Sequence, residues 1–178
     1  MNKNISFDLI PSFPGMYDNR AIKFYESGRT LHQQAKLREA ERAYNKAIKI
    51  NPDFFEAHNN LGNVLMERSR LKQAANSYRT ALNLLPGHPM LLNNLGNALQ
   101  LQGNNEEALR HLDQALRLEP DYADAHCNRG NALRGLQRID DAVAAYRRAI
   151  QIDSNLAEAH NNLGYLLLEQ EQTEAAIE

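Results

Sequence analysis

Asparagine recurs in this sequence at a fixed spacing, and its side chains are the clearest candidates for specific chemistry. The segments 56–62 and 158–164 both read EAHNNLG, and they start three intervals of 34 residues apart. At that interval asparagine fills one column at Asn60, Asn94, Asn128 and Asn162, and a second at Asn63, Asn97 and Asn131. An amide carries two donors and an acceptor, which match the C=O and N–H of a peptide backbone. The pattern therefore predicts a surface that forms hydrogen bonds with polypeptide.

The other reactive residue types form no catalytic or metal-binding pattern in the sequence. His58, His126 and His160 share one position of the 34-residue interval, so we expect each in a packed seam, too far from the others to share a metal. Cys127 has no base at a fixed spacing and is expected to be a small groove-side residue. Phosphate-loop, paired-carboxylate and HExxH patterns are absent. We predict that the chain is not an enzyme and binds neither cofactor nor metal.

Composition narrows the classes of partner. The chain has 178 residues and a formal net charge of −2, which gives no electrostatic reason to expect nucleic acid or an anionic membrane. A single cysteine excludes an intrachain disulfide. The sequence contains neither an apolar run of membrane-spanning length nor a secretory signal at its start, so we expect a cytoplasmic location.

The 34-residue period also predicts the organisation of the chain. The predicted parts are a non-repeat arm at 1–20, complete units at 21–54, 55–88, 89–122 and 123–156, and a partial fifth unit at 157–178. Position 8 of every unit is glycine, positions 20 and 27 are alanine, and position 24 is tyrosine or leucine. Positions 4, 7, 8 and 11 lie on one helical stripe and positions 20, 24 and 27 on another, so each unit is predicted to form two helices.

These columns also predict how the helices pack. Small residues at positions 8, 20 and 27 let two helices approach closely, and the large residue at position 24 fills the space between them. Proline at position 32 of the first three units follows the second helix, because it lacks the amide that would continue it. One helix pair cannot bury its apolar face alone, so the pairs must stack. The predicted fold is an all-α solenoid of antiparallel helix pairs.

The spacing of glycine, alanine, aromatic residue and proline resembles that of the tetratricopeptide repeat (TPR), a 34-residue unit. The resemblance covers residues 21–178, although the family's usual tryptophan at position 4 is absent. It implies a right-handed superhelix whose concave groove is lined by the first helix of each repeat. The asparagine columns are similar to those in the superhelix of the O-linked N-acetylglucosamine transferases, where an asparagine ladder holds polypeptide. That resemblance implies a peptide-binding role for the position 6 column.

Two interpretations of the asparagines stay open at this point. In the first, positions 5, 6 and 9 share a face turned away from the packed seam, and their amides form hydrogen bonds with an extended peptide. In the second, adjacent asparagines form hydrogen bonds with each other and stiffen the inner wall. Asparagine is a weak helix former, so either role has to offset a propensity cost.

The two ends of the chain carry separate expectations. Residues 1–20 contain Pro11 and Pro14 and several large apolar residues. They are expected to be a disordered leader, a cap on the first repeat, or a segment that inserts into the groove of another copy. We expect the chain to end a few residues into the second helix of the fifth repeat, as a fragment of a longer protein. Self-association through the exposed C-terminal end or the N-terminal arm is then expected.

The sequence thus predicts a non-catalytic protein-interaction module with a scaffold or adaptor role, which binds a protein or peptide in its groove. The alternative is the substrate-presenting arm of a larger enzyme, such as a glycosyltransferase, whose catalytic domain lies beyond residue 178. A third interpretation is that the repeats mainly self-assemble.

Overall fold

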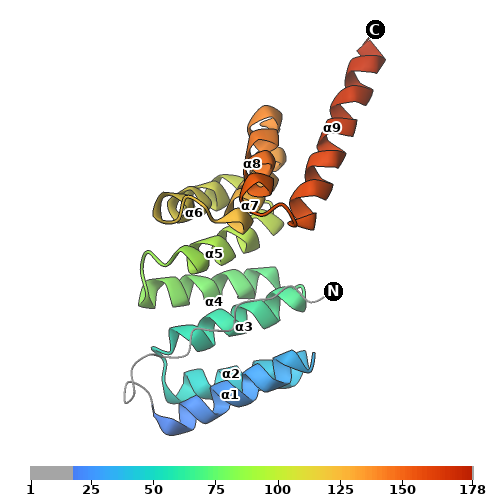
Figure 1. Ribbon diagram of the computed structural model, residues 1–178. Coiled ribbons are helices and arrows are strands. Elements are labelled where there is room, and N and C mark those ends of the chain that lie inside the picture. The colour runs from blue at the N-terminus through green and yellow to red at the C-terminus, as the bar shows by residue number, and fades with distance from the viewer. Residues whose placement is uncertain (1–17, 178) are drawn as a thin grey trace. The chain divides into compact units, whose positions relative to one another are not determined.

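The computed structural model describes the backbone of residues 18–177 and the side chains of residues 18–169. This part of the chain is helical and contains no strand (Figure 1). Its helices are α1 Asn19–Gln33, α2 Leu37–Ile50, α3 Phe55–Glu67, α4 Leu71–Leu84, α5 Pro89–Leu101, α6 Asn105–Leu118, α7 Ala123–Gly135, α8 Ile139–Ile152 and α9 Ala157–Ile177. The predicted all-α class is confirmed.

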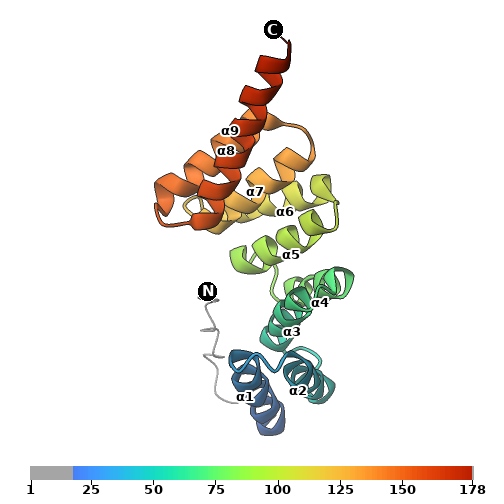
Figure 2. The same cartoon turned by 90° about the vertical axis from the view of Figure 1, so that its right-hand side faces the viewer.

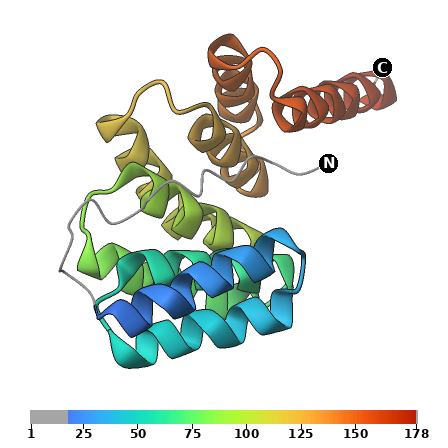
Figure 3. The same cartoon turned by 60° about the horizontal axis from the view of Figure 1, so that its bottom comes forward.

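The chain forms two compact units, Met1–Pro86 and Gly87–Glu178. In the first unit α1 packs against α2, α3 packs against α4, and α2 also contacts α3 (Figures 2 and 3). In the second unit the pairs are α5 with α6 and α7 with α8, while α6 contacts α7 and α8 contacts α9. Each unit is therefore a stack of antiparallel helix pairs, the arrangement of an α-solenoid of the tetratricopeptide type.

The seam between the two helices of a repeat is built as the columns predict. The position 24 side chains Tyr44, Leu112 and Tyr146 are fully buried. A Cβ added at Gly28 would lie 2.7 Å from Cε1 of Tyr44, and one added at Gly96 would lie 2.6 Å from Cγ of Leu112. Because a side chain cannot fit at that distance, glycine at position 8 is what lets the large residue at position 24 lie between the helices.

The turn inside each complete repeat uses one residue in the left-handed region. Position 15 holds Ala35, Ser69, Gly103 and Gln137, with φ between 56° and 81°. Only glycine adopts this backbone without cost, and other residues lose about 1–2 kcal/mol there. The close packing of the second helix against the first offsets that cost in the repeats that do not use glycine.

The fifth repeat differs from the others because its first helix does not turn. The helix α9 runs without a break to Ile177, through the position where a second helix was expected, and in Figure 1 its C-terminal part extends beyond α8. The equivalent turn would place Glu171 at position 15. By continuing as a helix, α9 avoids the left-handed residue that this turn needs in the complete repeats.

The first repeat also begins earlier than expected. The helix α1 starts at Asn19, two residues before the predicted unit, because the Asp18 carboxylate accepts a hydrogen bond from the backbone N–H of Arg20 at 2.7 Å. This is an N-cap, which satisfies a donor that the first turn leaves open. The remainder of the predicted arm, residues 1–17, lies outside the described residues. Among residues 18–177 no helix is both long enough and apolar enough to cross a bilayer.

Candidate functional site

Three of the position 6 asparagines link a first helix to the first helix before it. Asn128 of α7 donates from Nδ2 to Oδ1 of Asn93 on α5 at 2.8 Å. In the first unit Asn60 of α3 donates from Nδ2 to the hydroxyl of Tyr25 on α1 at 3.1 Å. Both bonds join position 6 of one repeat to position 5 of the preceding repeat, because adjacent first helices bring these two positions together. Amide groups in this column therefore have a fixed orientation.

The last member of the column uses a different partner. Position 5 of the fourth repeat is Cys127, which has no amide oxygen to offer. Asn162 of α9 instead donates from Nδ2 to Oδ1 of Asn131, at position 9 of α7, over 2.8 Å. The link between first helices is kept although its acceptor has moved by one helical turn.

The position 9 asparagines bond to the second helix of their own repeat. The hydroxyl of Tyr78 donates to Oδ1 of Asn63 at 2.7 Å, and that of Tyr146 donates to Oδ1 of Asn131 at 2.8 Å. The expectation that position 9 points away from the packed seam is wrong for these two residues. The phenol at position 24 is long enough to reach across the seam, and the pairing of tyrosine at 24 with asparagine at 9 was the signal for it.

The third repeat shows the reverse case, in which Leu112 replaces the tyrosine. No hydroxyl can then reach Asn97, and this side chain is half-buried, whereas Asn63 and Asn131 are buried. Its neighbour Asn94, at position 6, is also half-buried and has a bonding partner. Asn94 and Asn97 lie one turn apart on α5, so they form the most open part of the predicted columns.

Burial keeps the tyrosines of this network neutral. It raises the pKa to about 12 for Tyr25, for Tyr146, and for Tyr122, whose hydroxyl lies 3.5 Å from Nδ2 of Asn93. These phenols therefore stay protonated above pH 10. Tyr146 then remains the donor to Asn131, while the hydroxyl of Tyr25 accepts from Asn60. At neutral pH the amides of the asparagine columns and the hydroxyls bonded to them are uncharged, and they set one another's orientations. We call the surface that carries these columns on α3, α5, α7 and α9 the first-helix face.

The histidines at position 4 are anchored to the backbone. Nε2–H of His58 donates to the carbonyl of Pro52 at 2.9 Å, His126 does the same to Pro120 at 2.9 Å, and His160 to Ser154 at 3.0 Å. The expectation that these histidines lie in the packed seam is wrong, since His58 and His126 are half-buried and His160 is exposed. They tie α3, α7 and α9 to the turns before them. Among the described residues no three His, Cys, Asp or Glu side chains lie close enough to hold a metal ion. Cys127 is buried.

The arrangement can donate and accept hydrogen bonds in fixed directions. Asn131 is the most heavily used member, since its Oδ1 accepts from both Tyr146 and Asn162 and its Nδ2 lies 3.5 Å from Oε1 of Glu158. Asn128, by contrast, uses one donor in its bond to Asn93, so its amide keeps capacity for another partner. Of the seven predicted groove residues, the structure joins Asn128 to Asn93 and Asn131 to Asn162, and ties Asn60 and Asn63 to tyrosines.

Comparison with solved structures supports the fold. MamA 41-end from Desulfovibrio magneticus RS-1 superposes with a TM-score of 0.78 at 19% identity, covering 90% of each chain. PilF of Pseudomonas aeruginosa superposes with a TM-score of 0.74 at 23% identity, and the match covers 86% of this chain and 70% of the PilF chain. YrrB, described as a TPR protein with an unusual peptide-binding site, superposes with a TM-score of 0.69 at 24% identity, and the match covers 85% of this chain and 78% of the YrrB chain. No curated protein matches the chain.

The sequence profile of the TPR repeat matches four overlapping segments, at residues 28–67, 62–103, 101–137 and 130–171. Together they span most of the chain, from the second half of α1 to α9. Tetratricopeptide repeats serve generally as protein-interaction modules and carry no catalytic machinery of their own. By sequence profile and by fold, the chain belongs to the tetratricopeptide repeat family.

Proposed function

We propose that the chain is a scaffold or adaptor that binds an extended polypeptide on the first-helix face, mainly through backbone hydrogen bonds from its asparagine columns. The observation that carries this proposal is the pair of 2.8 Å amide links, Asn128 to Asn93 and Asn162 to Asn131, between consecutive first helices of the second unit. A ladder of amides that already hold one another in position loses little side-chain entropy when a ligand binds.

The spacing of such a ladder fits an extended peptide. Packed helices lie roughly 8–10 Å apart, and an extended chain rises about 3.3 Å per residue. One repeat therefore meets about every third residue of a bound peptide. Each hydrogen bond contributes only about 0.5–1.5 kcal/mol, so affinity depends on how many repeats take part. In this scheme Asn94 and Asn97 are half-buried contacts on α5, and Asn94, Asn60, Asn63, Asn128 and Asn162 offer the capacity that their internal interactions leave.

The experiment uses peptides selected from a random display library on the whole chain. Each selected peptide is resynthesised with N-methyl groups on the backbone at every third residue, and separately with single alanine substitutions. A backbone-reading ladder predicts that N-methylation weakens binding by tenfold or more, whereas most alanine substitutions change it less than threefold. If alanine scanning removes binding and N-methylation does not, the peptide is recognised by side-chain pockets and the ladder is wrong.

A matched pair of variants locates the site. Asn94→Ala combined with Asn97→Ala removes the two half-buried asparagine amides of α5. Asn83→Ala combined with Gln114→Ala removes two exposed amides from the second helices α4 and α6. Peptide binding should fall in the first variant and remain in the second. Equal loss in both, or in neither, would place the peptide elsewhere.

A second candidate role is self-association through α9. In the complete repeats the position 11 leucines such as Leu99 and Leu133 are buried against a second helix. On α9 the equivalent Leu167 is 36% exposed, and Tyr165 and Leu168 are 69% and 55% exposed. A second copy that covers this apolar face predicts a concentration-dependent dimer that Leu168→Glu abolishes, as sedimentation velocity would show. The other predicted route, through the N-terminal arm, lies outside the described residues.

A further inference from the structure

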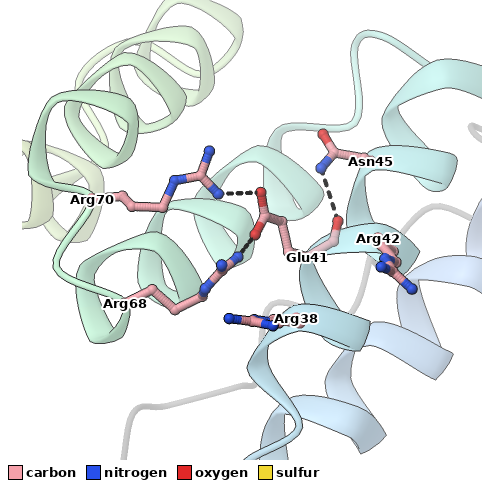
Figure 4. A pocket seen from close by; sticks show the side chains of 6 residues that line it. All are labelled: Arg38, Glu41, Arg42, Asn45, Arg68 and Arg70. Atoms are coloured by element: carbon pink, nitrogen blue, oxygen red, sulfur yellow. Dashed lines mark hydrogen bonds and ion pairs between the residues drawn. The ribbon is translucent and has the colours of Figure 1, made fainter.

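A group of arginines in the first unit forms a depression that the first-helix face does not include. It lies between α2 and the turn that joins α3 to α4, has a volume of about 230 Å³, and is shown in Figure 4. Its lining residues are Arg38, Glu41, Arg42, Asn45, Arg68 and Arg70. We call Arg38, Arg42, Arg68 and Arg70 the arginine cluster.

One carboxylate already occupies part of this depression. Glu41 accepts a hydrogen bond from Nη1 of Arg70 at 2.6 Å and forms an ion pair with Arg68 through its other oxygen. The side chain of Glu41 is only 17% exposed, so this double pairing is partly shielded from solvent. Figure 4 shows both arginines reaching it from the α3–α4 turn. The two guanidinium groups are therefore held in place by an internal anion.

Within residues 18–169 the other two arginines have no such partner. Arg38 and Arg42 lie one turn apart on α2 and are exposed, and no ion pair or hydrogen bond of the described residues involves them. Four guanidinium groups beside one carboxylate leave three positive charges in excess within the depression. Like charges so close repel one another, and the repulsion falls when a further anion binds.

We propose that the arginine cluster is a binding site for a phosphoryl group carried on a polypeptide, separate from the first-helix face. A phosphorylated side chain brings a charge of about −1.5 to −2 and three acceptor oxygens. The planar guanidinium donates two parallel hydrogen bonds to such a group. In this arrangement Arg38 and Arg42 bind the phosphoryl oxygens from α2, and the N–H groups of Arg68 that Glu41 does not use bind from the opposite side.

The charge distribution favours a phosphorylated polypeptide over nucleic acid. A nucleic-acid surface presents an extended basic stripe on a basic domain, whereas this chain has a net charge of −2 and a pI near 6.3. The cluster is confined to one depression of about 230 Å³, which suits a single phosphoryl group rather than a run of backbone phosphates.

Replacing Glu41 tests the proposal, because this substitution should strengthen phosphoryl binding. Its carboxylate competes with the incoming anion for Arg68 and Arg70. Glu41→Gln removes that competitor while it keeps the shape of the side chain, so phosphoryl binding should become tighter.

The experiment measures fluorescence polarisation with the whole chain at low ionic strength. The probes are a degenerate peptide library with phosphoserine at its centre, the same library with serine, and a short DNA duplex. We expect the phosphoserine library to bind and the serine library not to bind. Arg38→Ala with Arg42→Ala should weaken phosphopeptide binding by roughly tenfold or more, and Glu41→Gln should strengthen it several-fold.

Lys23→Ala with Lys49→Ala is the matched control, because it removes two exposed positive charges from the same unit away from the depression. It should bind phosphopeptide as the wild type does. The proposal is overturned if the phosphoserine library does not bind, if the arginine and lysine variants lose binding equally, or if DNA binds more tightly than phosphopeptide at the same salt concentration. Circular dichroism of each variant shows whether it is still folded, so that loss of the binding site can be distinguished from unfolding. Since Asn94→Ala with Asn97→Ala leaves the cluster intact, it should keep phosphopeptide binding whether or not the ladder binds peptide.

Discussion

Replacing the seam glycine of α7 tests how the helices of one repeat pack. A Cβ at Gly130 would lie 2.5 Å from Cε1, 2.7 Å from Cδ1 and 2.9 Å from Cζ of Tyr146. The Tyr146 ring has little freedom to move, since it is fully buried and its hydroxyl donates to Asn131. The added methyl group of Gly130→Ala therefore has to push the two helices apart or force the ring out of its place.

The magnitude follows from two opposing terms. Alanine is better than glycine inside a helix by about 0.5–1 kcal/mol, and overpacking a close-packed core costs about 1–3 kcal/mol. Gly130→Ala should thus lower the free energy of unfolding by up to about 2 kcal/mol. Gly164 on α9 is the matched control, because a Cβ there would meet no atom within 4 Å. Gly164→Ala keeps only the favourable term and should raise stability by about 0.5–1 kcal/mol.

Urea denaturation followed by circular dichroism compares the two variants. Their free energies of unfolding should differ by about 1–3 kcal/mol, and in a chain of this size each kcal/mol moves the melting temperature by about 2–4 °C. Gly28→Ala repeats the test in the other unit, where the added Cβ would lie 2.7 Å from Tyr44. If Gly130→Ala stabilises the chain as much as Gly164→Ala does, the tyrosine does not fill the seam as described and the packing argument is refuted.

Three further predictions concern the asparagine and tyrosine network. Asn128→Ala removes the link to the preceding first helix and should lower the free energy of unfolding by about 1–2 kcal/mol. In the same denaturation assay, Asn97→Ala should leave it unchanged or raise it by up to about 0.5 kcal/mol. If Asn97→Ala is the more destabilising of the two, the amide links do not contribute to stability. Tyr146→Phe leaves Oδ1 of Asn131 without that donor and should cost about 1 kcal/mol, with unchanged stability contradicting the bond. The pKa of Tyr25 and Tyr146 is about 12 in the folded chain and about 10 in the unfolded chain, so their contribution to the free energy of unfolding is complete below pH 10 and is lost between pH 10 and 12. The absorbance at 295 nm, which reports tyrosine ionisation, should therefore rise together with unfolding. Ionisation of these tyrosines near pH 10 in a chain that is still folded would refute the prediction.

Local sequence patterns determined the helix pairs and the seam. The 34-residue columns predicted which residues face one another, and Gly28 against Tyr44 lies as those columns imply. The prediction of the seam succeeds because a solenoid repeat contacts mainly its neighbours. Most of the residues whose contacts decide its packing therefore lie within one period of the sequence. The family resemblance rests on the same local spacing.

The orientation of the amide groups was not decided by the sequence. Helix periodicity placed Asn63 and Asn131 on the groove side, but the direction of an amide depends on which donor is within reach across the seam. The phenol of Tyr78 or Tyr146 supplies one, and Leu112 does not. Likewise Asn162 has the type and spacing of Asn128 but a different partner, because Cys127 replaces the asparagine in the preceding helix.

Tertiary structure alone also assembled the arginine cluster. Arg38 and Arg42 fit the solvated face of one helix, and Arg68 and Arg70 fit a turn some 30 residues later, so no local pattern joins them. The local pattern also did not decide the course of α9: the left-handed turn forms at position 15 of the complete repeats, whereas α9 continues as a helix through the equivalent position. Backbone periodicity is a local property that the sequence carries by itself, whereas hydrogen-bond partners, charge clusters and strained turns depend on which side chains the stacked repeats bring within a few ångströms of one another.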